Sequence, residues 1–175
     1  MTQPMHDLAD LIHSIPDYPI PGMVYRDITP LLRQPRAFQQ VVDMLARRYE
    51  DRAIDAVVGI ESRGFIFSAP LAYRLGVSLV PIRKFGKLPA AAYEVEYYLH
   101  YGPDKLQIHR DAFESGARVV VCDDLIATGS TVAAACELVT MAGGKVEEVT
   151  CLLELDPSQR RAHLAGCPIF SLIQL

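Results

Sequence analysis

The chain has 175 residues, a length that suits one domain with a substantial core. Half of its residues are hydrophobic and 22% are charged, which is ordinary globular composition. The formal net charge of -4 argues against a general nucleic-acid binder, which would carry a basic surface. Any phosphate site must therefore be a local basic pocket on an acidic protein.

No apolar run approaches the roughly 18 residues of a membrane span, and residues 1–10 contain no apolar signal core. The four cysteines form no C-x-x-C pair, so free thiols in a reducing cytoplasm are favoured over a zinc site or a disulfide framework. They are Cys122, Cys136, Cys151 and Cys167. We expect a cytoplasmic protein that binds neither membranes nor nucleic acid.

The first 49 residues predict two helices separated by a loop. Apolar residues recur at helical spacing over 7–15 and over 38–49, and the Pro- and Gly-rich residues 17–22 interrupt them. The segment 23–30 surrounds Tyr25. It is interpreted either as a surface loop held by one buried ring or as an aromatic platform for a heteroaromatic base, and the residues alone favour the loop.

A strand–loop–helix unit is predicted next, with a strand over 56–60 and a helix over 65–74 that ends at Gly76. Arg63 lies in the loop, beside the helix start. It can bind a diphosphate there, or it can pair with Glu61 on the surface.

The strand predicted over 78–82 is followed by three cations, Arg83, Lys84 and Lys87. Such a run usually forms a solvated face, but after a strand of an acidic protein it can also face an anion. Neither a Walker A pattern nor G-x-G-x-x-G occurs in the chain, so the sequence does not indicate a dinucleotide site.

Residues 93–101 and 105–109 alternate in polarity and predict a hairpin that turns at 102–104. No core face is evident in it, so we expect a mobile lid. His100 lies in this hairpin and can titrate near neutral pH.

Residues 119–131 are the most informative stretch. An apolar strand ends in Asp123 and Asp124, and a turn of small and hydroxyl residues then leads into a helix. Such a turn can cradle a phosphate on the free N–H groups of the helix start. The two acids then lie where the hydroxyls of a ribose 5-phosphate would be, and they can help to hold Mg2+. The alternative is a strand with solvated acids before an ordinary helix.

The remaining residues complete an alternating pattern of strands and helices. Strands are predicted over 146–155 and 168–173, and Asp156 and Ser158 can cap a short helix between them. The alternation predicts a single α/β domain over residues 1–175 with a mostly parallel sheet.

The stretch 119–131 resembles the signature of the type I phosphoribosyltransferases. Further stretches resemble the adenine phosphoribosyltransferase family within that superfamily, in its order and at its spacing: 14–19 with 21–22, 25–30, 59–65, 83–84 with 86–89, and 170–172. The resemblance implies a hood over residues 1–34 that binds the base and a flexible hairpin over 84–109. It also implies a homodimer that uses Mg2+ and converts adenine and phosphoribosyl pyrophosphate into AMP and pyrophosphate.

The resemblance also implies residue roles. Asp123 and Asp124 would face the ribose hydroxyls, and Mg2+ would be held mainly through substrate, with possible help from these acids. Val24 and Arg26 would contact the adenine edge through backbone groups, under a face covered by Tyr25. The 5'-phosphate would lie on Ala127, Thr128, Gly129, Ser130 and Thr131. Pyrophosphate would lie on Arg63, Arg83, Lys84 and Lys87, and the catalytic group would comprise His100, Tyr101 and Arg63.

Two positions depart from the family pattern. Ser130 replaces a second glycine, which matters only if that position needs a positive φ. His100 stands where the family usually carries the Glu assigned to proton handling; it can accept that proton, or it can be an unrelated polar residue.

The resemblance leaves two alternatives. One is a phosphoribosyltransferase for another purine. The other is a nucleotide-sensing regulator on the same fold, which would need a DNA-binding segment that the short acidic N-terminus has no room for.

Overall fold

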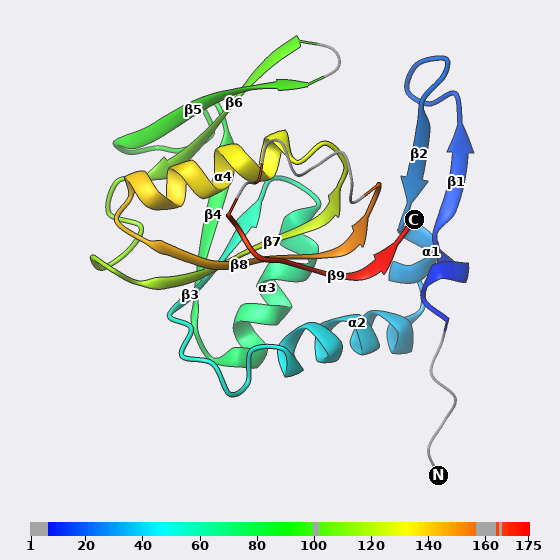
Figure 1. Cartoon of the computed structure of the whole chain (residues 1–175), viewed down its shortest axis with the longest axis horizontal. Helices are drawn as coiled ribbons and strands as arrows, with labels where there is room; N and C mark the ends of the chain where they lie inside the picture. The colour runs from blue at the N-terminus through cyan, green and yellow to red at the C-terminus, as the bar shows by residue number, and fades with distance from the viewer. Residues whose placement is uncertain (1–6, 100–101, 157–163, 165) are drawn as a thin grey trace. The chain divides into compact units, whose positions relative to one another are not determined.

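The computed structural model describes residues 7–99, 102–156, 164 and 166–175, and it forms two compact units, Met1–Met44 and Leu45–Leu175 (Figure 1). No helix in the described part of the chain has both the length and the apolar character needed to cross a bilayer.

The first unit is built on a two-stranded antiparallel sheet. After a 3-10 turn, η1 (Ala9–Leu11), strand β1 (His13–Pro16) pairs with β2 (Val24–Asp27), and Ile15 lies opposite Tyr25. The Asp27 carboxylate accepts the Thr29 N–H at 2.9 Å, which helps to start α1 (Thr29–Leu32). Helix α2 (Pro35–Arg47) begins in this unit and crosses its boundary.

Two sequence predictions in this unit are wrong. The helix expected over 7–15 is instead η1 followed by β1, because Ile15 precedes a proline and such residues favour extended backbone. The loop expected around Tyr25 is strand β2. In both places the pairing of β1 with β2 overrides the local pattern.

The second unit contains a seven-stranded sheet in the order β5-β6-β4-β3-β7-β8-β9. Strands β4, β3, β7, β8 and β9 run parallel to one another, and β5 and β6 pair in antiparallel fashion, which confirms the predicted mostly parallel α/β sheet. The strands are β3 (Ala56–Ile60), β4 (Ser78–Lys84), β5 (Ala92–Leu99), β6 (Gly102–His109), β7 (Arg118–Ile126), β8 (Lys145–Glu154) and β9 (Ile169–Gln174).

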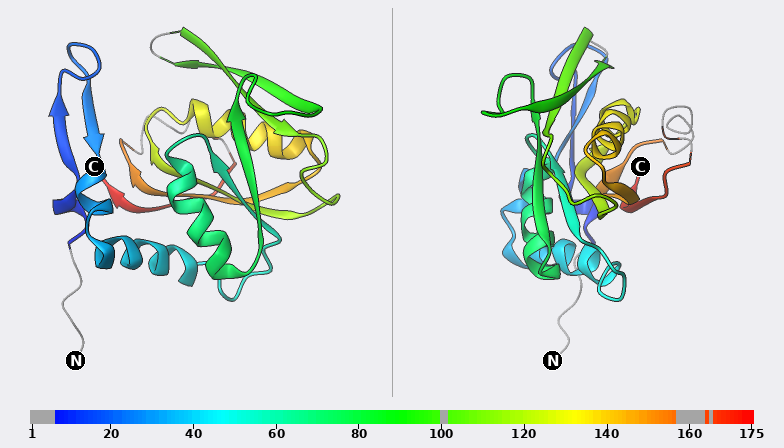
Figure 2. Two further views of the ribbon diagram at one scale, coloured as in Figure 1. Left: turned by 180° about the vertical axis from the view of Figure 1, so that it is seen from behind. Right: turned by 90° about the vertical axis from the view of Figure 1, so that its left-hand side faces the viewer.

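Helices α3 (Gly64–Leu75) and α4 (Ser130–Met141) cover opposite faces of this sheet (Figure 2). Alternate residues of β3 face opposite ways, so Val58 and Ile60 join the core cluster that contains α4 residues such as Leu138. Gly59 faces α3 instead, where an added Cβ would lie 2.1 Å from the Ser68 hydroxyl. Helix α3 ends at Gly76, as predicted, in a left-handed conformation with φ 67°.

The hairpin β5–β6 differs from its prediction. The expected turn residues 102–104 are the start of β6, with Gly102 opposite Leu99. Pro103 is tolerated because β6 pairs with β4 only around Gln107 and Leu106. The expectation that the hairpin lacks a core face is also wrong, because its strands contribute buried side chains to the core cluster around α4: Tyr97, Leu106 and Ile108.

A buried charge cluster ties the start of the second unit to β8. Glu148 is only 3% exposed, and its carboxylate accepts hydrogen bonds from Arg48, Tyr49 and Arg52 at 2.8–3.1 Å. Burial alone would raise the pKa of Glu148, but the hydrogen bonds from Arg48 and Tyr49 and the charge of Arg52 outweigh it and lower that pKa. The charged form of Glu148 is therefore part of the fold.

Candidate active site

The carboxyl ends of β3, β4 and β7 lie at one edge of the sheet, since the three strands are parallel neighbours. The loops that follow these strands carry the polar residues singled out in the sequence. In α/β folds this edge is where ligands bind.

Asp123 and Asp124 lie in the buried part of β7, near its carboxyl end at Ile126. They are 9% and 2% exposed, and the Asp124 N–H donates to the Asp123 carboxylate at 2.9 Å. Burial, and then the charge of Asp124, raises the pKa of Asp123; burial likewise raises the pKa of Asp124, against the opposing charge of Arg63. Burial thus makes the charged form of both carboxylates unfavourable, yet the fold holds them side by side at this edge of the sheet. Such an arrangement is typical of a functional site, and carboxylate oxygens can accept hydrogen bonds from a diol or bind a cation.

Arg63 forms an ion pair with Asp124. Its Nε lies 3.1 Å from Asp124 Oδ2, so the alternative in which Arg63 pairs with Glu61 is wrong. The next residue, Gly64, permits the close approach: an added Cβ would lie 2.9 Å from Asp123 Oδ1 and 3.0 Å from the Cys122 carbonyl oxygen. The start of α3 therefore abuts the two aspartates.

We expect Gly64→Ala to raise the KM for the ligand of this site by roughly tenfold, because the new methyl group would push Asp123 out of position, at a cost of about 1–3 kcal/mol. Steady-state kinetics would measure the change. Gly76→Ala at the other end of α3 is the control: its site is open, and only its φ of 67° is strained. If KM rose equally in both variants, the cause would be a loss of α3 stability and not the displacement of Asp123.

The turn after β7, which is predicted to cradle a phosphate, leads directly into helix α4. The Thr128 and Ser130 hydroxyls lie 3.0 Å apart, and Gly129 adopts φ 83° immediately before the helix. Ser130 is the first helical residue and is not among the described residues with positive φ, so the departure from glycine costs no backbone strain. Thr131 follows in the first turn, and Ala127 precedes the hydroxyl residues.

Two of the three predicted cations, Arg83 and Lys84 at the end of β4, are held by carboxylates. Arg83 donates to Glu61 from Nε at 2.9 Å and Nη2 at 3.3 Å, and Lys84 Nζ lies 2.7 Å from Asp104 on β6. The hydrogen bond from Arg83 lowers the pKa of Glu61, and the charge of Lys87 adds to that effect. Arg83, Lys84 and Lys87 therefore gather near Glu61, whereas Arg63 is engaged by Asp124.

Sequence reasoning missed Glu61 and Asp104 as partners of these cations. Glu61 was visible only as a neighbour of Arg63, and Asp104 was assigned to a turn. No local signal in the sequence indicates these pairs, because they depend on how β6 pairs with β4. That register places Asp104 just beyond the end of β4, near Lys84.

The residues expected to bind a base, Val24, Tyr25 and Arg26, lie together on β2 in the first unit. The Tyr18 ring meets the Tyr25 ring edge-on, with centroids 5.3 Å apart. Arg26 donates through Nη1 to the Ser14 hydroxyl on β1. Val24 is half exposed. In a two-stranded sheet only alternate backbone groups bond across the pair, so β2 also offers outward N–H and C=O groups.

His100 and Tyr101, expected among the catalytic residues, lie outside the described residues. The short helix expected from a cap at Ser158 also falls outside them for the most part. Both remain predictions.

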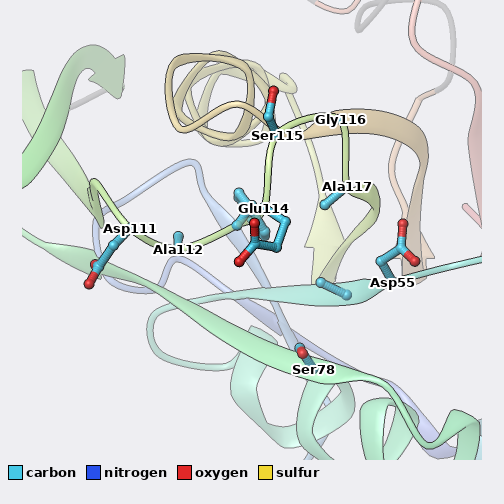
Figure 3. Close-up of a pocket in the computed structure, with 10 residues that line it drawn as sticks. Asp55, Ser78, Asp111, Ala112, Glu114, Ser115, Gly116 and Ala117 are labelled. Atoms are coloured by element: carbon cyan, nitrogen blue, oxygen red, sulfur yellow. The ribbon is translucent and has the colours of Figure 1, made fainter.

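A hollow of about 460 Å³ lies at the opposite edge of the sheet (Figure 3). Its walls come from Asp55, Ser78 and residues 111–117, at the amino ends of β3, β4 and β7. The Asp55 carboxylate there accepts the Arg118 N–H at 2.7 Å, which joins β3 to β7. The hollow is therefore separate from the site at the carboxyl ends.

The phosphoribosyl transferase domain family matches residues 27–172 of this chain. An adenine phosphoribosyltransferase of Roseiflexus sp. is 64% identical over 168 residues, which cover 96% of this chain and 98% of that protein. The adenine phosphoribosyltransferase of Chloroflexus aurantiacus is 62% identical over 168 residues, covering 96% of this chain and 97% of its own.

Solved structures agree with these matches. The adenine phosphoribosyltransferase of Thermoanaerobacter pseudethanolicus is 47% identical, with a TM-score of 0.92 over 97% of this chain and 98% of its own. The Saccharomyces cerevisiae enzyme, solved with an imino-altritol bisphosphate and adenine, is 38% identical, with a TM-score of 0.89 over 95% of this chain and 97% of its own.

Proposed function

This chain belongs to the adenine phosphoribosyltransferases of the phosphoribosyl transferase domain family, and we propose that its segment from Asp123 to Thr131 holds the ribose 5-phosphate of the substrate. The reaction transfers the 5-phosphoribosyl group from phosphoribosyl pyrophosphate to adenine, giving AMP and pyrophosphate, and so salvages a purine. The main support for this assignment is the buried pair of aspartates, which is followed by a turn with small hydroxyl residues at the start of helix α4.

In the proposed complex, the 5'-phosphate accepts hydrogen bonds from the N–H groups at the start of α4. These groups have no partner inside the helix, and its dipole favours an anion. The Thr128 and Ser130 hydroxyls, already 3.0 Å apart, add donors, with Ala127, Gly129 and Thr131 forming the rest of the turn. The Asp123 and Asp124 carboxylates accept from the ribose hydroxyls, which orients the sugar.

The leaving pyrophosphate is assigned to Arg63, Arg83, Lys84 and Lys87. Breaking the bond at C1 of the ribose builds negative charge on the leaving group, and fixed cations aimed at that charge lower the barrier. Because Asp124, Glu61 and Asp104 bind three of these cations in the present structure, the pyrophosphate must share or replace those carboxylates. The same carboxylates hold the cations in place before the substrate arrives.

Mg2+ is proposed as the cofactor. The oxygen atoms of Asp123 and Asp124 suit this hard cation, but no group of three His, Cys, Asp or Glu ligands occurs among residues that the structure describes. Substrate oxygens and water would therefore supply most of its ligands. When bound, the ion neutralises charge on the diphosphate.

Adenine is assigned to β2, with Tyr25 against the ring face and backbone groups of Val24 and Arg26 at the ring edge. The edge-on contact from Tyr18 and the bond from Arg26 to Ser14 support this, because both restrain the side chains of the strand. The outer part of the hairpin, where Tyr98 is exposed, is assigned to excluding water from the reacting sugar.

We expect His100→Ala to lower turnover by roughly ten- to a hundredfold, in keeping with the low end of general-base contributions. His100 occupies the place of the family's proton-handling Glu, and a neutral imidazole can accept the purine proton. The variant His100→Glu is the matched control and should retain or restore turnover. Unchanged turnover in His100→Ala would identify His100 as an ordinary polar residue.

A homodimer in the cytoplasm is also proposed. The cations at the end of β4 support the dimer, since a partner subunit can supply such groups to a phosphate site, and the four free thiols suit a reducing compartment. Light scattering coupled to size exclusion would measure the mass in solution.

The deciding experiment mixes the protein with adenine, phosphoribosyl pyrophosphate and Mg2+ and measures released pyrophosphate and AMP. Hypoxanthine, guanine and xanthine form the comparison panel, and a reaction with EDTA tests the need for the cation. Adenine should react fastest, and only with Mg2+. A preference for another base would correct the assignment of β2, and absence of turnover with every base would overturn the proposed function.

A further inference from the structure

Two cysteines from distant parts of the second unit face each other. Cys136 lies on α4, and Cys167 lies between Leu164 and β9, 31 positions further along the chain. Their sulfur atoms are 3.8 Å apart, both side chains are partly exposed, and both are free thiols. Neither residue belongs to the site proposed above.

The other two cysteines provide an internal contrast. Cys122 and Cys151 are fully buried in β7 and β8, and burial raises the pKa of both thiols well above its ordinary value. Thiolate is the form that reacts, so these two thiols should be inert. The partly exposed thiols of Cys136 and Cys167 can therefore be oxidised while the two buried thiols do not react.

The pair divides into a reactive thiol and a partner. The hydrogen bond with Cys136 lowers the pKa of Cys167 to about 7, which leaves a large thiolate fraction at neutral pH. The same hydrogen bond, together with burial, raises the pKa of Cys136. Cys136 therefore holds its proton more firmly than Cys167 does, and the two sulfur atoms lie only 3.8 Å apart.

We propose that Cys136 and Cys167 form a reversible redox site, in which a hydroperoxide oxidises Cys167 and Cys136 then closes an intramolecular disulfide. The Cys167 thiolate attacks one peroxide oxygen, the O–O bond breaks, and the departing oxygen takes up a proton to leave as water, or as alcohol from an organic peroxide. The Cys136 sulfur attacks the resulting sulfenic acid, and its proton leaves with the hydroxyl group as a second water. Two electrons pass from the thiols to the peroxide.

A disulfide requires the two sulfur atoms to close from 3.8 Å to about 2.05 Å. Cys136 is fixed on a helix, but Cys167 belongs to a turn, in which its N–H donates to the Leu164 carbonyl at 3.2 Å. The new bond would tie α4, which begins at Ser130 of the phosphate turn, to the entry of β9. Cross-linking a loop of this length should stabilise the fold.

The test treats the full-length protein with a small excess of hydrogen peroxide. We expect two thiols to be lost in a denaturing thiol titration and the intact mass to fall by about 2 Da. Peptide mapping should find Cys136 joined to Cys167, and Tm should rise by several degrees. Dithiothreitol should reverse all of these changes.

Single variants distinguish the two roles. Cys136→Ser should stop at a sulfenic acid on Cys167, which dimedone would trap, with no rise in Tm. Cys167→Ser should resist the same peroxide dose. Oxidation of Cys167→Ser at the wild-type rate, a disulfide between two molecules in place of the internal one, or four thiols remaining in the treated wild-type protein would each overturn the proposal.

Discussion

Asp123→Asn and Asp124→Asn are each expected to lower kcat/KM for phosphoribosyl pyrophosphate by at least about 100-fold, or roughly 2.7 kcal/mol of transition-state stabilisation. An amide keeps the shape but loses the charge that ribose hydroxyls and Mg2+ would contact. The Asp124 variant also releases Arg63, whose Nε lies 3.1 Å from the carboxylate. Steady-state kinetics with varied phosphoribosyl pyrophosphate would measure both.

The matched control is Asp111→Asn, an exposed aspartate beside the hollow at the opposite edge of the sheet. It should leave kcat/KM within twofold of wild type, on the order of the ±0.5 kcal/mol common for surface changes. Since burial raises the pKa of Asp123 and Asp124, substrate binding should weaken on acidification at a higher pH than exposed aspartates would give. Wild-type kinetics in either aspartate variant would remove the pair from the site.

Glu148→Ala is expected to destabilise the fold by about 3 kcal/mol and to lower Tm by roughly 6–12 °C. The change leaves the buried Tyr49 hydroxyl without its 2.8 Å acceptor and leaves Arg48 and Arg52 without their shared carboxylate. Differential scanning calorimetry would measure the shift. Turnover well below the melting range should stay near wild type, since Glu148 lies on β8 away from the phosphate turn.

The adjacent residue provides the control. Glu147 pairs with Lys145 and Arg118, whose side chains are 72% and 41% exposed, so Glu147→Ala should cost within about 1 kcal/mol. The pKa of Glu148 is lowered in the folded protein, so its contribution is present above the pKa of the unfolded chain. It is lost as pH falls through the folded value. Equal Tm shifts in the two variants would contradict a special role for Glu148.

Buried strands were the part of the fold most open to prediction. Ala56–Ile60 and the run from Val119 are continuous apolar segments, because parallel strands are covered on both faces. The polar residues at the carboxyl ends of these strands are Arg63 and the two aspartates. They lie close together because the two strands are parallel neighbours. The gathering of these residues at one edge of the sheet, where the site is proposed, was therefore predictable from the sequence.

The elements that depend on pairing with a distant partner were not predictable in this way. Residues 7–15 carry a helical stripe, yet Ile15 takes its conformation from Tyr25 across the strand pair. The burial of Leu106 and Ile108 requires α4, which comes later in the chain. The partners of Arg83 and Lys84 depend likewise on tertiary register, which local periodicity does not encode.

The bond between Lys84 and Asp104 links two strands with different tasks, because β4 carries two of the cations proposed to bind pyrophosphate and β6 belongs to the hairpin. Asp104 also accepts from the Tyr97 hydroxyl on β5 at 3.0 Å. A diphosphate that draws Lys84 away takes one of the donors that hold Asp104 in place. Anion binding and hairpin order are then coupled thermodynamically, so whatever loosens the hairpin also alters the affinity for the leaving group, and the reverse holds equally.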